Sequence, residues 1–140
     1  MAEAKRIVWL LFAGVMGAGF LFFPWKARAE TPYPNLSPAQ ARELIAKQAG
    51  NPDFVVLDVR TPGEFQSGRI GDAVLLDYNS GKFRAELGAL DRGKTYLVYC
   101  RTGNRSSGAV QAMKEEGFRN VYHLEGGIVK WKEGGLPTQK

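Results

Sequence analysis

Short apolar runs alternate with helical patterns along most of the chain. Four apolar runs predict strands at 54–58, 73–76, 95–99 and 120–124. Two helical patterns predict helices at 82–90 and 106–116. The strand runs are continuously apolar instead of alternating with polar residues, which is typical of strands covered on both faces. The pattern therefore predicts an α/β fold, a parallel sheet with helices on each side.

A further helix is predicted at the start of the folded part of the chain. The Ser37 hydroxyl can cap a helix, Pro38 suits the first helical position, and apolar residues then recur at helical spacing as far as about Lys47. Residues 30–35 contain two prolines and predict a linker. The sequence therefore predicts one domain over residues 36–140, without internal repeats or low-complexity segments.

The first 29 residues have the pattern of a targeting segment. Residues 7–23 carry no charge, Lys5 and Arg6 precede them, and Ala27-Arg28-Ala29 has the small-x-small pattern of a signal peptidase site. As a helix this run is about 25 Å long, at the lower limit for crossing a membrane. We therefore expect a signal peptide over residues 1–29, cleavage before Glu30 and a periplasmic or exported domain.

The same segment is also compatible with a retained membrane anchor. Lys26 and Arg28 are unusual so close to a cleavage site, and together with Trp25 they suit the interface between membrane and water. In that case the domain is attached to the membrane through residues 7–23. A third alternative, a buried core helix, is disfavoured by the length of the apolar run.

Charge and cysteine content narrow the possible functions. The formal charge of +5 is concentrated at the start, and the residues after position 29 have a net charge of only +2. We therefore expect no nucleic-acid partner. Cys100 is the one cysteine, which excludes an intramolecular disulfide, a cysteine-rich zinc site and an iron–sulfur cluster built from this chain alone.

The candidate chemistry lies in the polar loop that follows the strand predicted at 95–99. A helix is expected to begin near Ser106 or Ser107, so the loop meets a helix N-terminus, whose dipole and unpaired amides favour a thiolate at Cys100. Gly103 allows the left-handed backbone that a cradle of converging amides requires. The amides of the loop, together with the side chains of Arg101 and Arg105, would also hold an oxyanion. The candidate substrate-binding residues are Arg101, Thr102, Gly103, Asn104 and Arg105.

This loop resembles the active-site loop of the rhodanese (sulfurtransferase) family, and the flanking segments strengthen the resemblance. Residues 58–65 (DVRTPGEF), followed by GRI at 68–70, look like the family's DVR-x-x-x-EF…GHI stretch. Residues 124–137 (LEGGIVKWKEGGLP) look like its GG-x-x-x-W…GLP ending. The three motifs come in the family's order, and the resemblance covers about residues 36–137. Arg69 stands where the family usually has histidine, which concerns local hydrogen bonding and not the fold.

The resemblance implies a three-layer fold with a parallel sheet of about five strands and Cys100 at the C-terminal edge of a central strand. It implies a sulfurtransferase of the thiosulfate:cyanide class. In such an enzyme Cys100 takes sulfur from a small donor such as thiosulfate, holds it as a persulfide and passes it to a thiol or cyanide-like acceptor. No metal or organic cofactor is expected, and the pattern specifies no oligomeric state.

Other interpretations of the loop remain open. Cys100 could be a small buried hydrophobe at the end of a strand, although two arginines and a glycine follow it directly. The related dual-specificity phosphatases have five residues between cysteine and arginine, whereas four separate Cys100 from Arg105, which disfavours a phosphatase or arsenate reductase. A sulfide-carrying or redox-sensing binding module would keep the persulfide without rapid turnover.

Several nearby residues are predicted to be structural. His123, the sole histidine, is interpreted as structural or exposed and not as a general base for Cys100, which weakens a papain-like mechanism. Gly126 and Gly127 predict a turn, and Trp131 a core or pocket-wall aromatic. Three charged residues are expected to form structural salt bridges: Asp58, Arg60 and Glu64.

Overall fold

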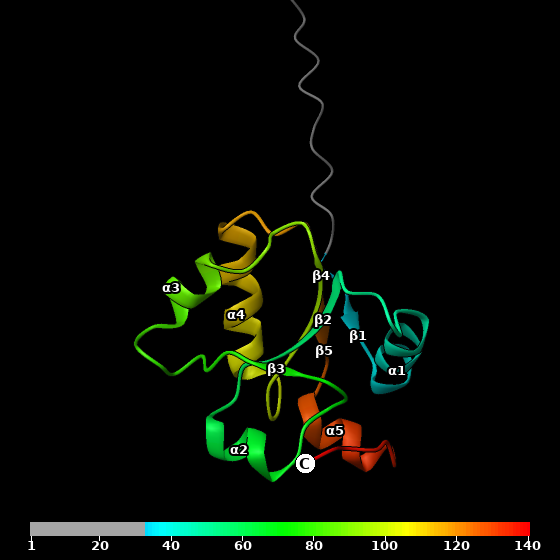
Figure 1. Ribbon diagram of the computed structural model, residues 1–140. Helices are drawn as coiled ribbons and strands as arrows, with labels where there is room; N and C mark the ends of the chain where they lie inside the picture. Colours follow the sequence, from blue (N-terminus) through cyan, green and yellow to red (C-terminus); the bar gives the residue numbers. More distant parts are fainter. Residues whose placement is uncertain (1–32) are drawn as a thin grey trace, which may run out of the picture. The chain divides into compact units, whose positions relative to one another are not determined.

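Five parallel strands form a single sheet in the computed structural model, which describes residues 33–140 (Figure 1). The strands are β1 (Asn35–Leu36), β2 (Phe54–Asp58), β3 (Val74–Leu75), β4 (Thr95–Tyr99) and β5 (Asn120–Leu124). Their order across the sheet is β1-β5-β4-β2-β3, and every neighbouring pair is parallel. The predicted α/β fold with a parallel sheet of about five strands is therefore confirmed.

Two edge strands differ from the sequence prediction. β3 is shorter than the predicted run at 73–76. β1 falls where the linker was expected to end, and its two residues pair with the last strand, Asn35 opposite His123 and Leu36 opposite Leu124. Two residues are too few to show a periodic pattern, so β1 exists because of its pairing with β5.

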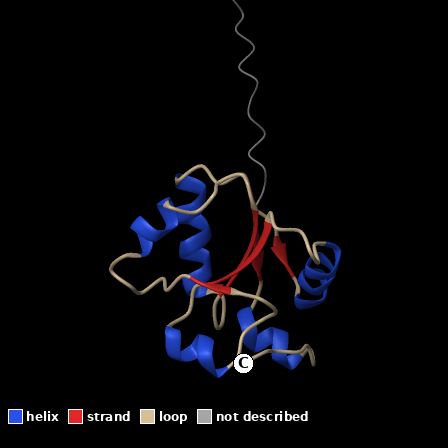
Figure 2. Cartoon of the chain, viewed as in Figure 1, coloured by secondary structure: helices blue, strands red, loops and turns tan. Residues whose placement is uncertain are grey.

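Five helices flank the sheet within residues 33–140. They are α1 (Pro38–Lys47), α2 (Pro62–Ser67), α3 (Phe83–Gly88), α4 (Asn104–Glu115) and α5 (Gly127–Glu133). Figures 1 and 2 show α3 and α4 on one side of the sheet and α1 on the other, with α2 and α5 at the lower end of the view. The helices α1, α3 and α4 correspond to predicted helices, whereas α2 and α5 were missed.

Local capping explains where α1 and α2 begin. In α1 the Ser37 hydroxyl accepts a hydrogen bond from the Gln40 backbone, and the Gln40 side chain accepts one from the Ser37 backbone. Thr61 and Glu64 form the same capping box in α2, with proline again at the first helical position. The start of α2 was therefore visible in the sequence, but its six residues are too few for helical periodicity to appear.

Alternating side chains along the central strands divide the core into two clusters. Tyr96, Val98 and Cys100 pack with residues of α3 and α4 in one cluster. Leu97 and Tyr99 pack with residues of α1 and α5 in the other. This alternation is the ordinary period of a strand, and both faces of β4 are covered by helices. The period continues one residue beyond β4, so it places the Cys100 side chain on the α4 face.

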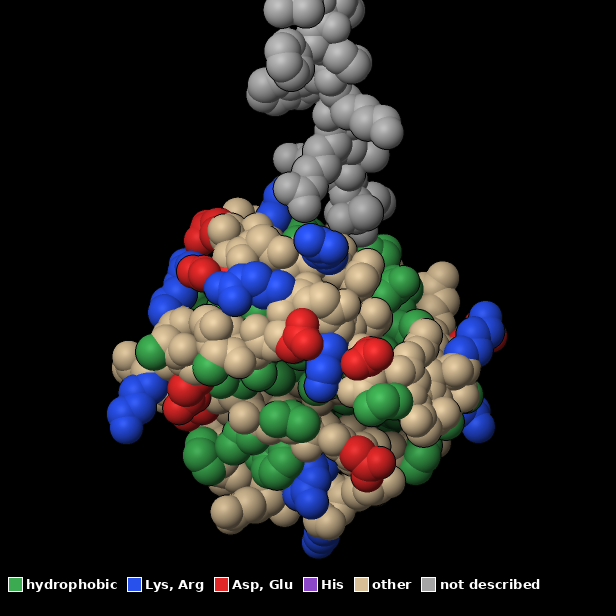
Figure 3. Space-filling model, turned by 45° about the horizontal axis from the view of Figure 1, so that its top comes forward, with side chains coloured by type: hydrophobic (Ala, Val, Ile, Leu, Met, Phe, Trp, Pro, Cys, Tyr) green, Lys and Arg blue, Asp and Glu red, His purple; other side chains and the backbone are tan. Residues whose placement is uncertain are grey.

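The predicted signal or anchor segment at 1–29 lies outside the described residues. Within residues 33–140, no helix is long and apolar enough to cross a membrane. On the face shown in Figure 3, basic and acidic side chains are interspersed among apolar ones.

Candidate functional site

Cys100 lies at the base of a tight loop between β4 and α4. Its residue surface is only 1% exposed. Gly103 has φ 112° and turns the chain from the strand into α4. The left-handed backbone predicted for this glycine is therefore confirmed. The Gly103 backbone N–H donates to Cys100 Sγ at 3.0 Å, and the Ser106 hydroxyl lies 3.3 Å from the same sulfur. The loop therefore folds around the sulfur atom and presents hydrogen-bond donors to it.

These donors determine the protonation of the cysteine. Burial alone raises the pKa of the Cys100 thiol, because it disfavours the charged form. Hydrogen bonds from the Ser106 side chain and from the backbone of Ser106, Gly103 and Thr102 outweigh burial, and the pKa lies below its ordinary value. Cys100 is thus a buried thiol in surroundings that favour the thiolate.

The start of α4 differs from the prediction. The helix begins at Asn104, not near Ser106 or Ser107, so Asn104 and Arg105 belong to its first turn. Left-handed Gly103 already ends the loop, which leaves only two residues, Arg101 and Thr102, between the cysteine and this glycine. Arg101, Thr102 and Asn104 are exposed at the surface of the loop.

The two arginines of the loop have different surroundings. Arg105 forms a two-point ion pair with Glu64 of α2, at 2.7 and 3.0 Å. Hydrogen bonding from Arg105 lowers the pKa of Glu64 to about 2. Among residues 33–140, by contrast, no hydrogen bond or ion pair involves the Arg101 side chain. Arg105 therefore ties the loop to α2, while Arg101 keeps its charge available.

Helix α5 supports the loop from outside. The Ile128 N–H donates to the Cys100 carbonyl at 3.0 Å, and the Val129 N–H donates to the Arg101 carbonyl at 3.1 Å. Both N–H groups belong to the first turn of α5, where a helix has unpaired donors. Gly126 and Gly127 do turn the chain, with φ of 74° and 62°, but Gly127 also begins a helix that was not predicted.

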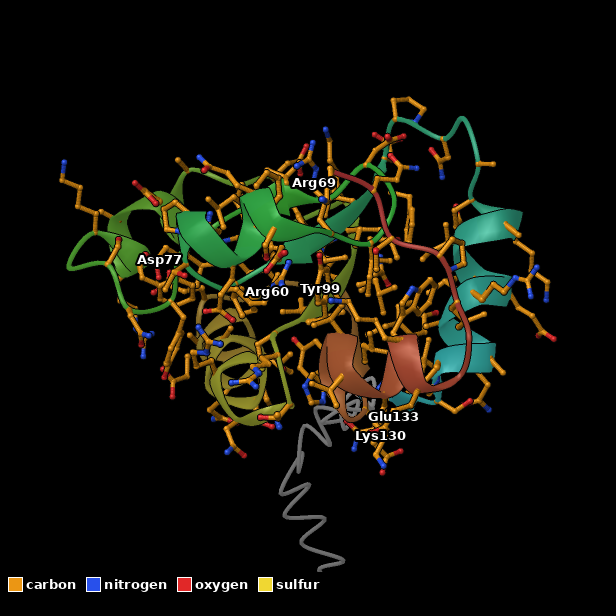
Figure 4. The ribbon with its side chains drawn as sticks, turned by 90° about the horizontal axis from the view of Figure 1, so that it is seen from below. Arg60, Arg69, Asp77, Tyr99, Lys130 and Glu133 are labelled. Carbon is orange, nitrogen blue, oxygen red and sulfur yellow. The ribbon has the colours of Figure 1, made fainter. Side chains whose placement is uncertain are left out.

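A buried polar network lies between α2 and the end of β4, where Figure 4 shows Arg60 and Tyr99. Tyr99 and Cys100 belong to different core clusters, so the network lies on the opposite face of β4 from Cys100. Arg60 and Asp58 form an ion pair at 2.6 Å, with side chains 4% and 0% exposed. Arg60 also donates to the Gly68 carbonyl at 2.7 Å. The Tyr99 hydroxyl donates to Asp58 at 2.6 Å and accepts the Ile70 N–H at 3.0 Å. Asp58 and Arg60 form the predicted structural salt bridge, while Glu64 pairs with Arg105 instead.

His123 is buried, 8% exposed, so of the two predicted alternatives, a structural or an exposed side chain, the exposed one is wrong. Its Nε2 lies 2.6 Å from the Ser106 hydroxyl oxygen, which is itself in contact with Cys100. Its Nδ1 lies 2.9 Å from Asn35 Oδ1. Sequence reasoning did not include Ser106 or Asn35 in the site. The position of Ser106 directly after Arg105 was the one available signal, and nothing local marked Asn35.

Arg69 and Trp131 have structural surroundings. The Arg69 guanidinium lies over the Phe65 ring, 4.4 Å from its centroid, and its backbone pairs with Gln139 in an antiparallel bridge. Arg69 therefore serves packing at the position where the family usually has histidine. Trp131 is 3% exposed in the core and donates its indole N–H to the Pro137 carbonyl at 2.9 Å, as predicted for a core aromatic.

Comparisons with known proteins show similarity to rhodanese-like domains. The family model described as a rhodanese-like domain matches residues 37–134. A sulfurtransferase of Allochromatium vinosum is 32% identical over 97 residues, which cover 69% of this chain and 89% of that protein. A crystal structure of a rhodanese-related protein from Thermoplasma volcanium has a TM-score of 0.65 and 34% identity, covering 76% of this chain and 98% of the other.

Other relatives are longer than this chain. An uncharacterized protein of Synechocystis sp. is 39% identical over 105 residues, which cover 75% of this chain and 55% of that protein. Several tRNA uridine(34) hydroxylases also match; the one from Cytophaga hutchinsonii is 38% identical over 106 residues, 72% of this chain and 33% of the hydroxylase. The chain thus spans about half of the first of these relatives and about a third of the second.

Proposed function

This chain belongs to the rhodanese-like domain family, and on that premise we propose that it is a sulfurtransferase whose Cys100 carries the transferred sulfur as a persulfide. The observation that carries the proposal is the set of hydrogen bonds to Cys100 Sγ from Gly103 and Ser106. A cysteine that served only as a small hydrophobe would have no need of these donors. Their effect on the pKa of the thiol favours the nucleophilic form.

The reaction consists of two displacements at sulfur. The Cys100 thiolate attacks the outer sulfur of thiosulfate, a new S–S bond forms, and sulfite leaves with the electron pair of the broken bond. The product is an anionic persulfide on Cys100. A thiolate or cyanide acceptor then attacks the outer sulfur and releases the Cys100 thiolate. Donors at the loop stabilise the negative charge in both steps.

Intact-mass measurement after treatment with thiosulfate tests this proposal. The wild-type chain is expected to gain the mass of one sulfur atom, and Cys100→Ser, which removes its one cysteine, is expected to gain none. Addition of cyanide should remove the extra mass and release thiocyanate over many turnovers. An unchanged wild-type mass would contradict sulfur transfer, and a single slow turnover would favour a carrier module. A separate assay with aryl phosphates tests the phosphatase alternative, which Cys100-dependent hydrolysis would favour.

The two loop arginines are expected to behave differently. Arg101→Ala should raise KM for thiosulfate by about tenfold with little loss of stability, since its exposed charge has no partner among residues 33–140 and is available to the anionic donor. Arg105→Ala should mainly lower the thermal midpoint, because Arg105 is held in the ion pair with Glu64. Donor kinetics and thermal midpoints measured together check both expectations.

Arg84→Ala is the matched control for these variants. Arg84 is an exposed arginine paired with Glu115 at the far end of α4, and its loss should change neither KM nor the thermal midpoint appreciably. If Arg101→Ala had the kinetics of Arg84→Ala, Arg101 would have no part in donor binding. An equal effect of all three substitutions would indicate general electrostatic attraction instead of a loop site.

A further inference from the structure

A continuous chain of polar contacts runs from Cys100 into the sheet. Cys100 Sγ contacts Ser106 Oγ at 3.3 Å, and Ser106 Oγ contacts His123 Nε2 at 2.6 Å. His123 Nδ1 contacts Asn35 Oδ1 at 2.9 Å. The register of the sheet explains the last contact, because Asn35 and His123 are direct partners in the parallel pair β1 and β5. Ser106 is fully buried, so its hydroxyl is shielded from bulk solvent.

The Asn35 contact determines which histidine nitrogen is protonated. An amide oxygen can only accept a hydrogen bond, so the proton of the neutral ring is held on Nδ1. Nε2 is then left with a lone pair that faces the Ser106 hydroxyl. The third neighbour of this hydroxyl, the Gly103 carbonyl at 3.1 Å, can only accept. Asn35 thus prepares Nε2 to receive a proton from the side of Cys100.

We propose that His123 is a positioning residue that holds the proton of the Cys100 thiol, acting through Ser106. The S–H bond of Cys100 breaks as Ser106 Oγ gains its proton, and the original hydroxyl proton of Ser106 passes to His123 Nε2. The products are a Cys100 thiolate, a neutral Ser106 and a His123 imidazolium; nothing is oxidised or reduced. The imidazolium then donates to Ser106 Oγ, so the Ser106 hydroxyl can donate to the thiolate.

The surroundings of His123 couple its charge to that of Cys100. Burial lowers the pKa of His123, while Glu125 and the backbone of Gly103 raise it. The group that faces His123 from β1 is the neutral side chain of Asn35. From the first turn of α4, the charge of Arg105 interacts electrostatically with Cys100. Burial disfavours an imidazolium, and a thiolate at Cys100 adds a negative charge beside that of Glu125 that stabilises it. The two groups titrate as a pair, with two macroscopic steps.

We call the path from Cys100 through Ser106 to His123 the proton relay. The pH profile of Cys100 alkylation by iodoacetamide tests this relay in the full-length chain. Because the chain has one cysteine, every alkylation event reports on Cys100. The wild type is expected to show two steps, the lower of which marks the thiolate–imidazolium pair. His123→Gln keeps a hydrogen-bonding group but cannot hold the proton, so it should show one step and about tenfold slower alkylation at pH 6. Ser106→Ala should also show a single step.

Tyr122→Phe is the matched control. Tyr122 lies on β5 next to His123, but it packs in the core cluster that does not contain Cys100. It should retain both steps. Two unchanged steps in His123→Gln would overturn the relay, as would an additional effect of His123→Gln in the Ser106→Ala background, because His123 would then act independently of Ser106.

A second measurement leaves His123 in place, in case its substitution prevents folding. The chain has one histidine, so nitrogen NMR of histidine-labelled protein reports on a single ring. Cys100→Ser removes the thiolate and is expected to lower the pKa of His123 by about one unit. Identical titration in the wild type and Cys100→Ser would overturn the relay. The relay gains its role in catalysis from the proposed sulfur transfer, but neither measurement uses a sulfur donor, so failure to form a persulfide and failure of the relay are distinguishable.

Discussion

Asp58→Asn is expected to lower the free energy of unfolding by about 3–5 kcal/mol, the usual cost of removing one partner of a buried ion pair. Asp58 is fully buried and accepts hydrogen bonds from the Arg60 side chain, the Arg60 backbone and the Tyr99 hydroxyl. An asparagine amide supplies one acceptor and one donor group, so it leaves at least one of these donors unpaired. It also leaves the Arg60 charge, 4% exposed, without a counter-charge. Urea unfolding measures the loss.

The matched control for Asp58→Asn is Glu115→Gln. Glu115 also pairs with an arginine, Arg84, but both side chains are more than half exposed. Its substitution should change stability by less than about 1 kcal/mol. A loss in Asp58→Asn as small as that in Glu115→Gln would show that the network around Tyr99 rearranges or admits water, and that burial does not set the cost.

Gly127→Ala is expected to reduce persulfide formation by about 100-fold, in line with the effect of small displacements at a reacting centre. A Cβ at Gly127 would lie 2.3 Å from the Arg101 carbonyl oxygen and 2.6 Å from the Cys100 carbonyl oxygen. These contacts are with backbone, which has no flexible end to move aside. The loop would be pushed away from α5, and the donors around Cys100 Sγ would move with it. The initial rate of sulfur loading from thiosulfate, followed by intact mass, measures the effect.

Gly117→Ala separates the close approach from backbone strain. Gly117 also has a left-handed backbone, with φ 82°, but a Cβ there meets nothing within 4 Å. Its substitution should therefore cost only about 1 kcal/mol of stability and leave the loading rate unchanged. If both variants loaded sulfur at the wild-type rate, the support from α5 would have no part in forming the site.

Elements with a local code were predictable from the sequence, and those that depend on distant partners were not. The start of α1 is encoded within four residues by Ser37, Pro38 and Gln40, and its predicted bounds are confirmed. The strands β2 and β4 were also predictable, because each contains a continuous run of apolar residues. β1 was missed because it is stabilised by pairing with a strand that lies more than eighty residues later in the chain. α5 was missed because its seven residues follow two glycines that indicated only a turn.

The site shows the same division. The composition of the loop indicated Cys100 and the left-handed Gly103, because both properties belong to neighbouring residues. The partner of Arg105 lies 41 positions away, and the partner of Ser106 lies 17 positions away. Parallel topology predicts that such residues reach the same edge of the sheet, but it does not determine which atoms meet. The loop composition predicted that Arg105 binds an anion, but its guanidinium is paired with the Glu64 carboxylate.

The pairing of Asn35 with His123 has a consequence for anyone who transfers this domain into another protein. The family model matches residues 37–134, which would be a natural module to excise. That module retains Cys100 but lacks Asn35, and it also lacks Gln139, whose backbone pairs with Arg69. A graft with those boundaries would have the nucleophile in place and its histidine free to rotate or change tautomer. The smallest portable unit that keeps both contacts extends from Asn35 to Gln139.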